Sequence, residues 1–175
     1  MEKRVIRSDI KSFYGVGAGE NPAFTRMQGF TELSTSKNPK EHSVQYVDEA
    51  HETTAVTGFS PSMAFTLDRL DGNAVHDDIV ELFNNEAIGT DAERYIVHVD
   101  FTKKNADGSY PAIKRKFAVI GDSEGNGTDA YQYSGTFKTA GSSIKGSATI
   151  TEPEDGNPEN VKVITFAESA DAADE

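Results

Sequence analysis

The sequence contains no cysteine and no tryptophan among its 175 residues. Without cysteine the chain cannot form disulfides, zinc sites built on thiolates or a thiol nucleophile. Apolar runs are short, as in residues 117–120, so no segment is long enough to cross a bilayer as a helix. The opening residues Met1–Val5 are charged and then polar, and we expect no secretory signal there. These absences predict a soluble protein of intracellular synthesis.

Basic residues are also scarce. The chain has 17 Lys and Arg against 29 Asp and Glu, which gives a formal net charge of −12. A protein that grips DNA without reading its sequence needs Lys and Arg to displace counterions, so this balance argues against that class. Two interpretations stay open. The acidic surface keeps the protein dispersed, or it is useful because it does not adhere to nucleic acid.

Most of the chain has the two-residue periodicity of β-strands. The pattern is regular over residues 94–101, 113–119 and 161–166, and weaker over 27–34, 63–70 and 43–48. Residues 131–137 and 144–150 are expected to form a pair of strands joined through Ala140–Ser142. The Asp-Gly step within Asn105–Ser109 predicts a hairpin turn between two strands.

One segment has the helical period instead. Its apolar residues recur at i, i+4, i+7 and i+8 and form one stripe: Val75, Ile79, Leu82 and Phe83. Asn73 is a suitable N-cap, and Gly89 is suited to end the helix. The sequence therefore predicts a helix over residues 74–86 and a mainly β fold, a β-sandwich or barrel with this one flanking helix.

Three stretches look unpacked in a monomer. Residues 7–22 are rich in glycine, residues 35–57 form a long polar connection, and residues 168–175 are small and acidic. The predicted organisation is an N-terminal arm over 1–22, a β-domain over 23–167 that carries the long loop 35–57, and a flexible acidic tail over 168–175.

No motif for catalysis, cofactor binding or metal binding emerges. His98 and Asp100 share one face of a strand, but such residues are more often outward polar positions than metal ligands. His76 with its two following aspartates is most simply a charged helix start. Residues 122–129 resemble a calcium loop in part, yet residue 133 is Tyr where a bidentate Glu is needed, so an acidic hairpin connection explains them better.

Several strings in order carry a family resemblance. They include Met27–Lys40, Gln45–Glu49, Val56–Ser62, Phe117–Gly125 and Thr128–Lys138. Together these strings resemble the major tail proteins, or tail tube proteins, of tailed phages and prophages of Gram-positive bacteria. The resemblance covers residues 23–150.

This resemblance implies a structural virion protein and no enzyme. Hexameric rings of such subunits stack into the hollow tail tube, the conduit for DNA delivery into the host. Implied partners are other copies of the chain, the tail terminator, the tail-tip and tape-measure proteins, and a sheath where the tail has one. DNA would pass without adhering, no cofactor or membrane contact is implied, and the chain would be made in the bacterial cytoplasm and end in the virion.

The long loop matches the family's contact between rings. We expect its polar and aromatic residues to lie at subunit contacts: Lys37, Asn38, Lys40, Tyr46, Asp48 and Glu49. One alternative is another phage ring or decoration protein, from the neck, the tail terminator or the head. A second is a non-catalytic β-sandwich binding module. The absence of Trp argues against a carbohydrate-binding platform, which needs exposed aromatic residues.

Overall fold

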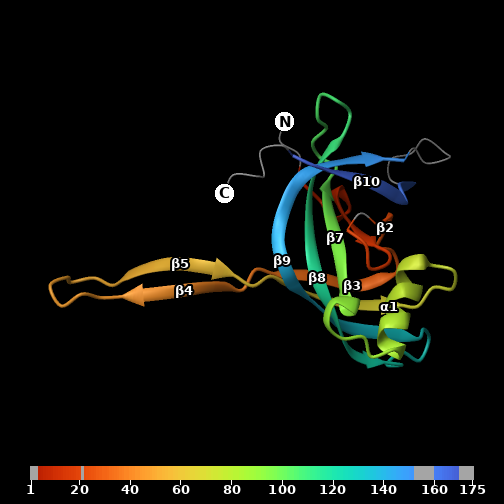
Figure 1. The fold of residues 1–175 in the computed structure, drawn as a ribbon, viewed down its shortest axis with the longest axis horizontal. Coiled ribbons are helices and arrows are strands. Elements are labelled where there is room, and N and C mark those ends of the chain that lie inside the picture. Colours follow the sequence, from red (N-terminus) through yellow and green to blue (C-terminus); the bar gives the residue numbers. More distant parts are fainter. Residues whose placement is uncertain (1–3, 21, 152–159, 170–175) are drawn as a thin grey trace.

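The computed structural model describes residues 4–20, 22–151 and 160–169. Within them, strands dominate and one α-helix is present (Figure 1). The strands are β1 (Ile10–Gly15), β2 (Phe24–Arg26), β3 (Phe30–Ser36), β4 (Pro39–Val44), β5 (Thr53–Phe59), β6 (Ser62–Asp68), β7 (Glu93–Asp100), β8 (Tyr110–Glu124), β9 (Gln132–Ile150) and β10 (Val163–Glu168). The helix α1 spans Ala74–Asn84, and short 3-10 turns occupy Arg7–Asp9 and Gly89–Ala92. The mainly β fold class is confirmed.

Most of the eight-stranded sheet closes into a barrel, and its two remaining strands extend beyond the barrel. Its strand order is β10-β2-β1-β7-β8-β9-β6-β3, and β10 also pairs with β9. The strands from β10 to β9 thus form a closed barrel, while β6 and β3 continue the sheet beyond it. β9 makes both connections, because residues 132–138 pair with β6 and residues 146–150 pair with β10.

The central strands bury side chains on both faces. Phe13 and Tyr14 are neighbours on β1 and are both fully buried, yet they belong to separate apolar clusters. Successive side chains of a strand point to opposite faces, so β1 and β7 lie between two cores. One core fills the barrel and includes Phe24, Val97 and Ile164. The other lies between the extended sheet, α1 and β1–β7.

The second core is aromatic and is covered at one end by α1. Phe65 and Phe137 stack with ring centroids 4.4 Å apart. α1 contributes buried Val75 and Ile79, as the helical stripe predicts, whereas Phe83 is only partly buried. The far end of this core is not covered by any helix among the described residues.

The N-terminal end of α1 agrees with the prediction, but its C-terminal end differs from it. The Asn73 side chain accepts hydrogen bonds from the backbone N–H groups of Val75 and His76, which confirms it as the N-cap. The helix ends at Asn84, and the residue with positive φ after it is Glu86 (φ 47°). The prediction that Gly89 ends the helix is wrong, because Gly89 begins the following 3-10 turn.

The prediction that His76 belongs to a charged helix start is also wrong. His76 is fully buried rather than a charged surface residue at the helix start. The Leu70 N–H donates to its Nδ1 at 3.0 Å, so Nε2 carries the hydrogen and donates to the Gln28 carbonyl at 2.6 Å. Burial lowers the pKa of His76, and the imidazole acts as a neutral bridge between two loops and the helix.

A buried polar cluster ties α1 to the sheet. The Tyr14 hydroxyl donates to Asp78 Oδ2 at 2.6 Å, and Arg94 Nε donates to the same oxygen at 2.8 Å. Arg94 also donates to the second carboxylate oxygen, which gives the fork geometry that Arg favours. Burial, with the negative charge of Asp78, raises the pKa of Tyr14 well above its usual value.

Two sequence predictions about the sheet are wrong. The segment 7–22 is not unpacked, because Ile10–Gly15 forms β1 between β2 and β7. Residues 140–142 do not turn the chain, because β9 runs unbroken through them and pairs with β8 on both sides of a register shift. The turn expected at residues 105–109 is confirmed as the β7–β8 connection. The hairpin connection expected at 122–129 is confirmed as the β8–β9 connection, which spans residues 125–131 because β8 continues to Glu124.

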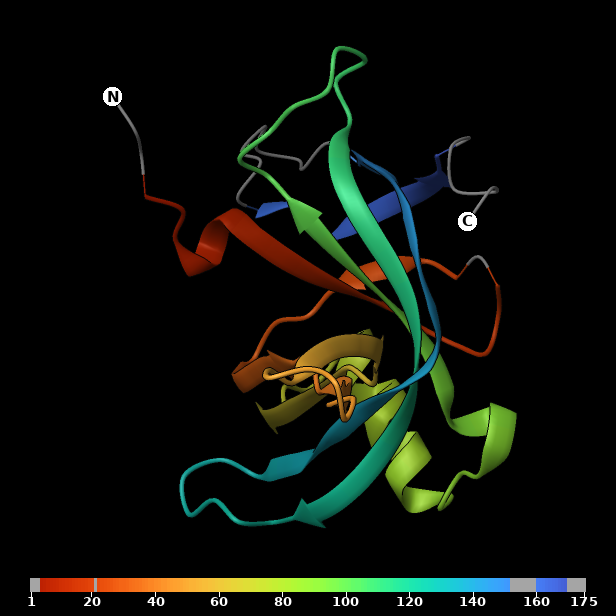
Figure 2. The same cartoon turned by 90° about the vertical axis from the view of Figure 1, so that its left-hand side faces the viewer.

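The long connection 35–57 is not an irregular loop. It contains β4 and β5, which pair only with each other and project far from the body (Figure 1). Figure 2 views this hairpin end-on, and the body lies behind it. The short strand expected at 43–48 is displaced, since β4 ends at Val44 and residues 45–52 form the turn. We call residues 39–59 the hairpin and residues 45–52 its tip.

The ends of the predicted organisation lie in part outside the described residues. The described residues exclude residues 1–3 and 21 of the proposed N-terminal arm and residues 170–175 of the proposed acidic tail. Within the described residues, no helix has the length and apolar character needed to span a bilayer.

Candidate assembly surfaces

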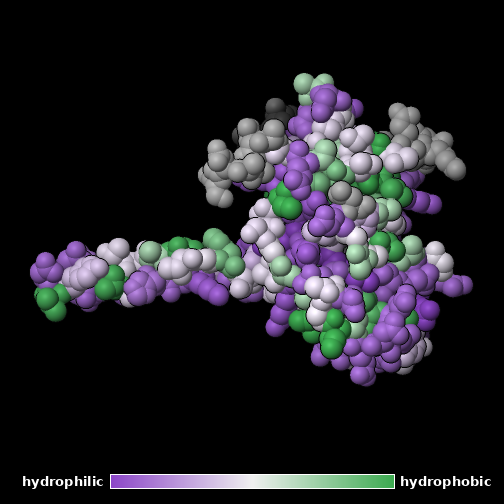
Figure 3. Space-filling model, in the orientation of Figure 1, coloured by the Kyte–Doolittle hydropathy of each residue, from purple (hydrophilic) through white to green (hydrophobic). Residues whose placement is uncertain are grey.

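The hairpin is exposed on both faces. Every residue of β4 and β5 is exposed except Val44 and Gly58, which are half-buried. Its apolar side chains face solvent as well: Val56 is 57% exposed and Phe59 is 60% exposed. Figure 3 shows it standing clear of the body with polar and apolar side chains mixed along it. A lone two-stranded hairpin is marginally stable in water, and this one has both faces available for contacts.

The six residues expected at subunit contacts fall into two groups, all of them exposed. Lys37, Asn38 and Lys40 lie at the base of the hairpin, while Tyr46, Asp48 and Glu49 lie in the tip. A strand rises about 3.3 Å per residue, so β4 holds the two groups roughly 20 Å apart. The structure therefore does not bring the six residues together within one molecule.

Asn38 has a structural role at the base. It adopts a positive φ of 44°, and its side-chain amide donates to the Ser60 carbonyl and to Ser62 Oγ. Ser60 N–H in turn donates to the Asn38 carbonyl at 3.1 Å. These bonds close the neck between the body and the hairpin and fix the direction in which the hairpin leaves.

The second surface is an extended four-stranded sheet. It consists of residues 119–124 of β8, residues 132–138 of β9, β6 and β3. β7 pairs with β8 only as far as Ala118, so residues 119–124 have an open edge. β3 pairs with β6 alone, and its other edge receives a side-chain bond from Arg7 Nη2 to the Leu33 carbonyl. The described sheet thus has two open edges on opposite sides.

One face of this four-stranded sheet is apolar and the other is polar. Along β6 and β9, buried residues alternate with half-buried ones, and the buried ones belong to the aromatic core. The opposite face, which we call the polar face, is made mostly of small residues with three carboxylates and one ammonium. Its residues include Glu32, Ser34, Ser36, Ser62, Ala64, Thr66, Asp68, Ile120, Asp122, Gln132, Ser134, Thr136 and Lys138.

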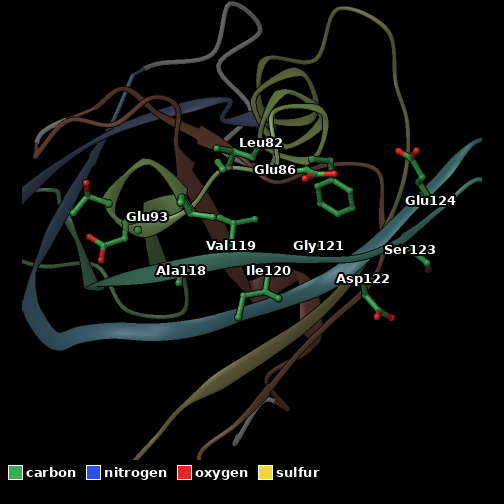
Figure 4. A pocket seen from close by; sticks show the side chains of 16 residues that line it. Leu82, Glu86, Glu93, Ala118, Val119, Ile120, Gly121, Asp122, Ser123 and Glu124 are labelled. Atoms are coloured by element: carbon green, nitrogen blue, oxygen red, sulfur yellow. The ribbon is translucent and has the colours of Figure 1, made fainter.

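A groove of about 750 Å³ follows the open edge of β8. Figure 4 shows Leu82 of α1 and Val119 of β8 on its apolar floor, while Ile120 and Asp122 point to the other side of the strand. Its rim is acidic, formed by Glu86, Glu93 and Glu124. We call this surface the acidic groove.

A second groove, of about 460 Å³, lies at the uncovered end of the aromatic core beside the base of the hairpin. Its rim carries three cations, Arg7, Lys37 and Arg115, and among the described residues no carboxylate belongs to its lining. We call it the basic groove. Its apolar lining comes from four strands, β1, β3, β6 and β8: Ile10, Leu33, Met63, Ile113 and Phe117.

His98 lies at the wall of the basic groove. Its Nδ1 is 2.9 Å from Ser12 Oγ, and it does not share a site with Asp100, which accepts hydrogen bonds from Thr102. Burial, together with the charges of Arg7, Lys37 and Arg115, lowers the pKa of His98 to about 4. The imidazole is therefore neutral at pH 7. Among the described residues, no group of three potential ligands is arranged to hold a metal ion.

Sequence reasoning did not find the basic groove. Arg7 and Arg115 are separated by more than a hundred residues, and only strand pairing brings them to one place. Lys114, next to Arg115, points to the opposite face and is buried in the barrel, where its ammonium lies over the rings of Tyr95 and Phe166. The sequence alone does not show that Arg115 lies at the groove whereas Lys114 is buried in the barrel.

Comparison with known proteins gives a structural match and no sequence match. No protein-family model matches the chain, and no curated protein matches it in sequence. The fold is similar to a subunit of the SPP1 tail tube, with a TM-score of 0.63 and 15% identity over 81% of this chain and 78% of that one. A weaker likeness is to the baseplate of the anti-feeding prophage, with a TM-score of 0.49 and 8% identity over 83% of this chain and 97% of that one. The SPP1 match shows a tail-tube fold.

Proposed function

We propose that this chain is the tail tube protein of a phage, a structural subunit that closes into hexameric rings and stacks into the tube that conducts DNA into the host. The observation that carries the proposal is a tail-tube fold whose four-stranded sheet has two open edges and whose hairpin projects without packing on its own body. Both features leave hydrogen-bonding groups and apolar surface that only neighbours can satisfy.

The open edges support ring formation. An exposed strand edge invites pairing with another chain, and a soluble monomer normally blocks it. Here one edge is β3 and the other is residues 119–124 of β8, on opposite sides of the same sheet. If β3 of one subunit lies along β8 of the next, the contact is heterologous and a rotation can close it into a ring.

The polar face supports the role of a conduit. It presents serine, threonine and alanine with Glu32, Asp68 and Asp122 against a single Lys138, so its formal charge is 1 − 3 = −2. Lys and Arg side chains lining a channel would bind the phosphates of DNA, so a channel through which DNA moves freely should have few of them. We place this face toward the lumen, because the other face of the same sheet is occupied by the aromatic core.

The hairpin supports stacking. It departs from the body in one direction, and its exposed strands would become ordered against subunits of the adjacent ring. Lys37, Asn38, Lys40, Tyr46, Asp48 and Glu49 are the proposed contact residues. The proposed domain division is an N-terminal arm at 1–22 that joins the barrel through β1, the tube domain at 23–167 with its hairpin, and an acidic tail at 168–175.

In this role the chain acts without catalysis or cofactor, as part of the virion after synthesis in the host cytoplasm. Its partners are further copies of itself, the tail terminator, and the tail-tip and tape-measure proteins. The strings quoted above favour a long-tailed phage or prophage of a Gram-positive host.

The test is negative-stain electron microscopy of the purified protein over a concentration series, paired with light-scattering mass. We expect hollow tubes or rings with sixfold symmetry. Rings that never stack would indicate a neck or terminator protein instead. A species of 18.9 kDa at every concentration, even with tail-tip proteins supplied, would contradict the proposal.

A variant isolates the ring contact. Because the Leu33 carbonyl points away from β6 toward Arg7, the N–H of Thr35, two residues on, points to the same open edge. Thr35→Pro removes that donor without removing a bond to β6. We expect a folded monomer by circular dichroism and no rings, and normal ring formation would show that the β3 edge is not the contact.

A further inference from the structure

We propose that the basic groove of one copy receives the hairpin tip of a second copy. The inference rests on the proposed function, since it names the surface that the hairpin contacts when rings stack. It commits to a second copy of this chain as the occupant.

The groove needs an anionic, partly apolar occupant. Arg7, Lys37 and Arg115 converge on it, and in the part of the chain that the structure describes no lining carboxylate balances them. Their joint field contributes to the low pKa of His98. Around the cations, apolar side chains remain in water: Ile10 is 39% exposed and Ile113 is 47% exposed. An occupant that supplies carboxylates and covers these side chains would relieve both the repulsion and the exposure.

The hairpin tip has the complementary chemistry. Its charged groups are the carboxylates of Asp48, Glu49 and Glu52, and it contains no Lys or Arg. Tyr46 and Val47 project beside them, 58% and 108% exposed. Within the tip, the Glu49 N–H donates to the Tyr46 carbonyl at 3.0 Å, and this bond closes the turn that carries these side chains.

The occupant has to come from another molecule. Lys37 belongs to the groove and also to the base of the hairpin, so β4 and β5 hold the tip of the same molecule away from its own groove. In Figure 1 the hairpin projects over a length comparable with the width of the body. A neighbour displaced along the hairpin by one body width therefore brings its groove beside this tip.

The acidic groove does not suit the tip. Three carboxylates of its rim would face the carboxylates of the tip: Glu86, Glu93 and Glu124. Like charges at close range disfavour association. Tip and basic groove are different surfaces of the same chain, so their contact is heterologous and repeats from one subunit to the next. Such a contact propagates a stack.

Charge reversal tests the pairing. Asp48→Lys with Glu49→Lys, or Lys37→Glu with Arg115→Glu, should each lower the mass of pelletable tubes about tenfold or more, because like charges then meet. The four changes together should restore tubes to within about twofold of the wild type, since the pairs are opposite again. Lys103→Glu with Lys104→Glu makes the same charge change in the β7–β8 turn and should have little effect.

The outcomes separate the two proposals. If the wild type forms no rings or tubes, the proposed function and this inference fall together. If the wild type forms tubes and the reversals leave them unchanged, the inference is overturned and the proposed function stands. If either reversal abolishes tubes and the combination fails to restore them while remaining folded, tip and groove do not meet.

A cysteine pair keeps the inference testable if the fourfold variant does not fold. The natural chain has no cysteine. A variant with Val47→Cys in the tip and Thr35→Cys in the groove should form, on oxidation of assembled tubes, a ladder of covalent oligomers. The control pairs Val47→Cys with Thr128→Cys in the β8–β9 connection. No excess of oligomers over this control, in preparations that contain tubes, would overturn the contact.

Discussion

The body and the hairpin of this protein are built from the same residue types but obtain their order in different ways. In the body, β1 and β7 lie between two cores, and residues such as Phe65 and Phe137 are buried and stacked. In the hairpin, Phe59 and Val56 are as apolar but remain more than half exposed. The difference indicates that the body is stable through its own packing, whereas the hairpin depends on neighbours.

The largest expected effect is on assembly. Replacing residues 39–59 with two glycines keeps Asn38 and Ser60 close, where their backbones already bond. We expect tubes to disappear while circular dichroism and the melting temperature of the body change little, because the deleted strands bury almost nothing. Electron microscopy and thermal unfolding measure the two quantities. A melting temperature lowered by about 10 °C or more would show that the hairpin stabilises the body.

The next effect sharpens the comparison with matched residues. Phe137→Ala removes a fully buried ring and should lower the free energy of unfolding by about 3–5 kcal/mol. Phe59→Ala removes a ring of the same size from the hairpin and should change it by less than ~0.5 kcal/mol, while weakening assembly. Urea unfolding of both variants tests this. Equal losses would contradict the division between body and hairpin.

A polar contact of the body should matter less than an aromatic one. Asp78→Asn leaves the buried guanidinium of Arg94 without its carboxylate and should cost about 1.5–3 kcal/mol of unfolding free energy. Glu93→Gln alters the more exposed pair with Lys116 and should cost less than about 1 kcal/mol. If the two variants unfold at the same urea concentration, the buried cluster does not anchor α1.

The last prediction concerns how the free energy of unfolding depends on pH. Because the pKa of His98 is lowered to about 4 in the folded protein, its neutral form is favoured by folding. The contribution is fully present above the unfolded pKa of about 6.5 and is lost as the pH falls toward 4. By pH 5 about 2 kcal/mol of this contribution has been lost. His98→Gln should flatten the stability profile between pH 6.5 and 4 relative to the wild type, and parallel profiles would refute the assignment.

The sequence is most informative where an element has one buried face. The stripe from Val75 to Leu82 predicts α1 because polar and apolar residues separate cleanly on the helix. The alternation over 94–101 also predicts β7, although β7 buries side chains on both of its faces. The turn at Asn105–Ser109 is local chemistry, and it too is confirmed.

The sequences of other elements have no such pattern. β1 is buried on both faces, so Phe13 and Tyr14 adjoin without alternating, and the glycines after them suggest a loop. β4 and β5 are exposed on both faces, so no hydrophobic period marks them either. The basic groove depends on strand pairing between residues far apart in the sequence, which no local motif reveals.

Hydrogen exchange tests the central claim most directly. The backbone amides of residues 39–59 should be compared with those of the β6–β9 ladder, in dilute protein and in assembled tubes. We predict strong protection of the ladder in both states, and protection of the hairpin that appears only on assembly. A hairpin already protected like the ladder in the monomer, or unprotected in tubes, would contradict the account.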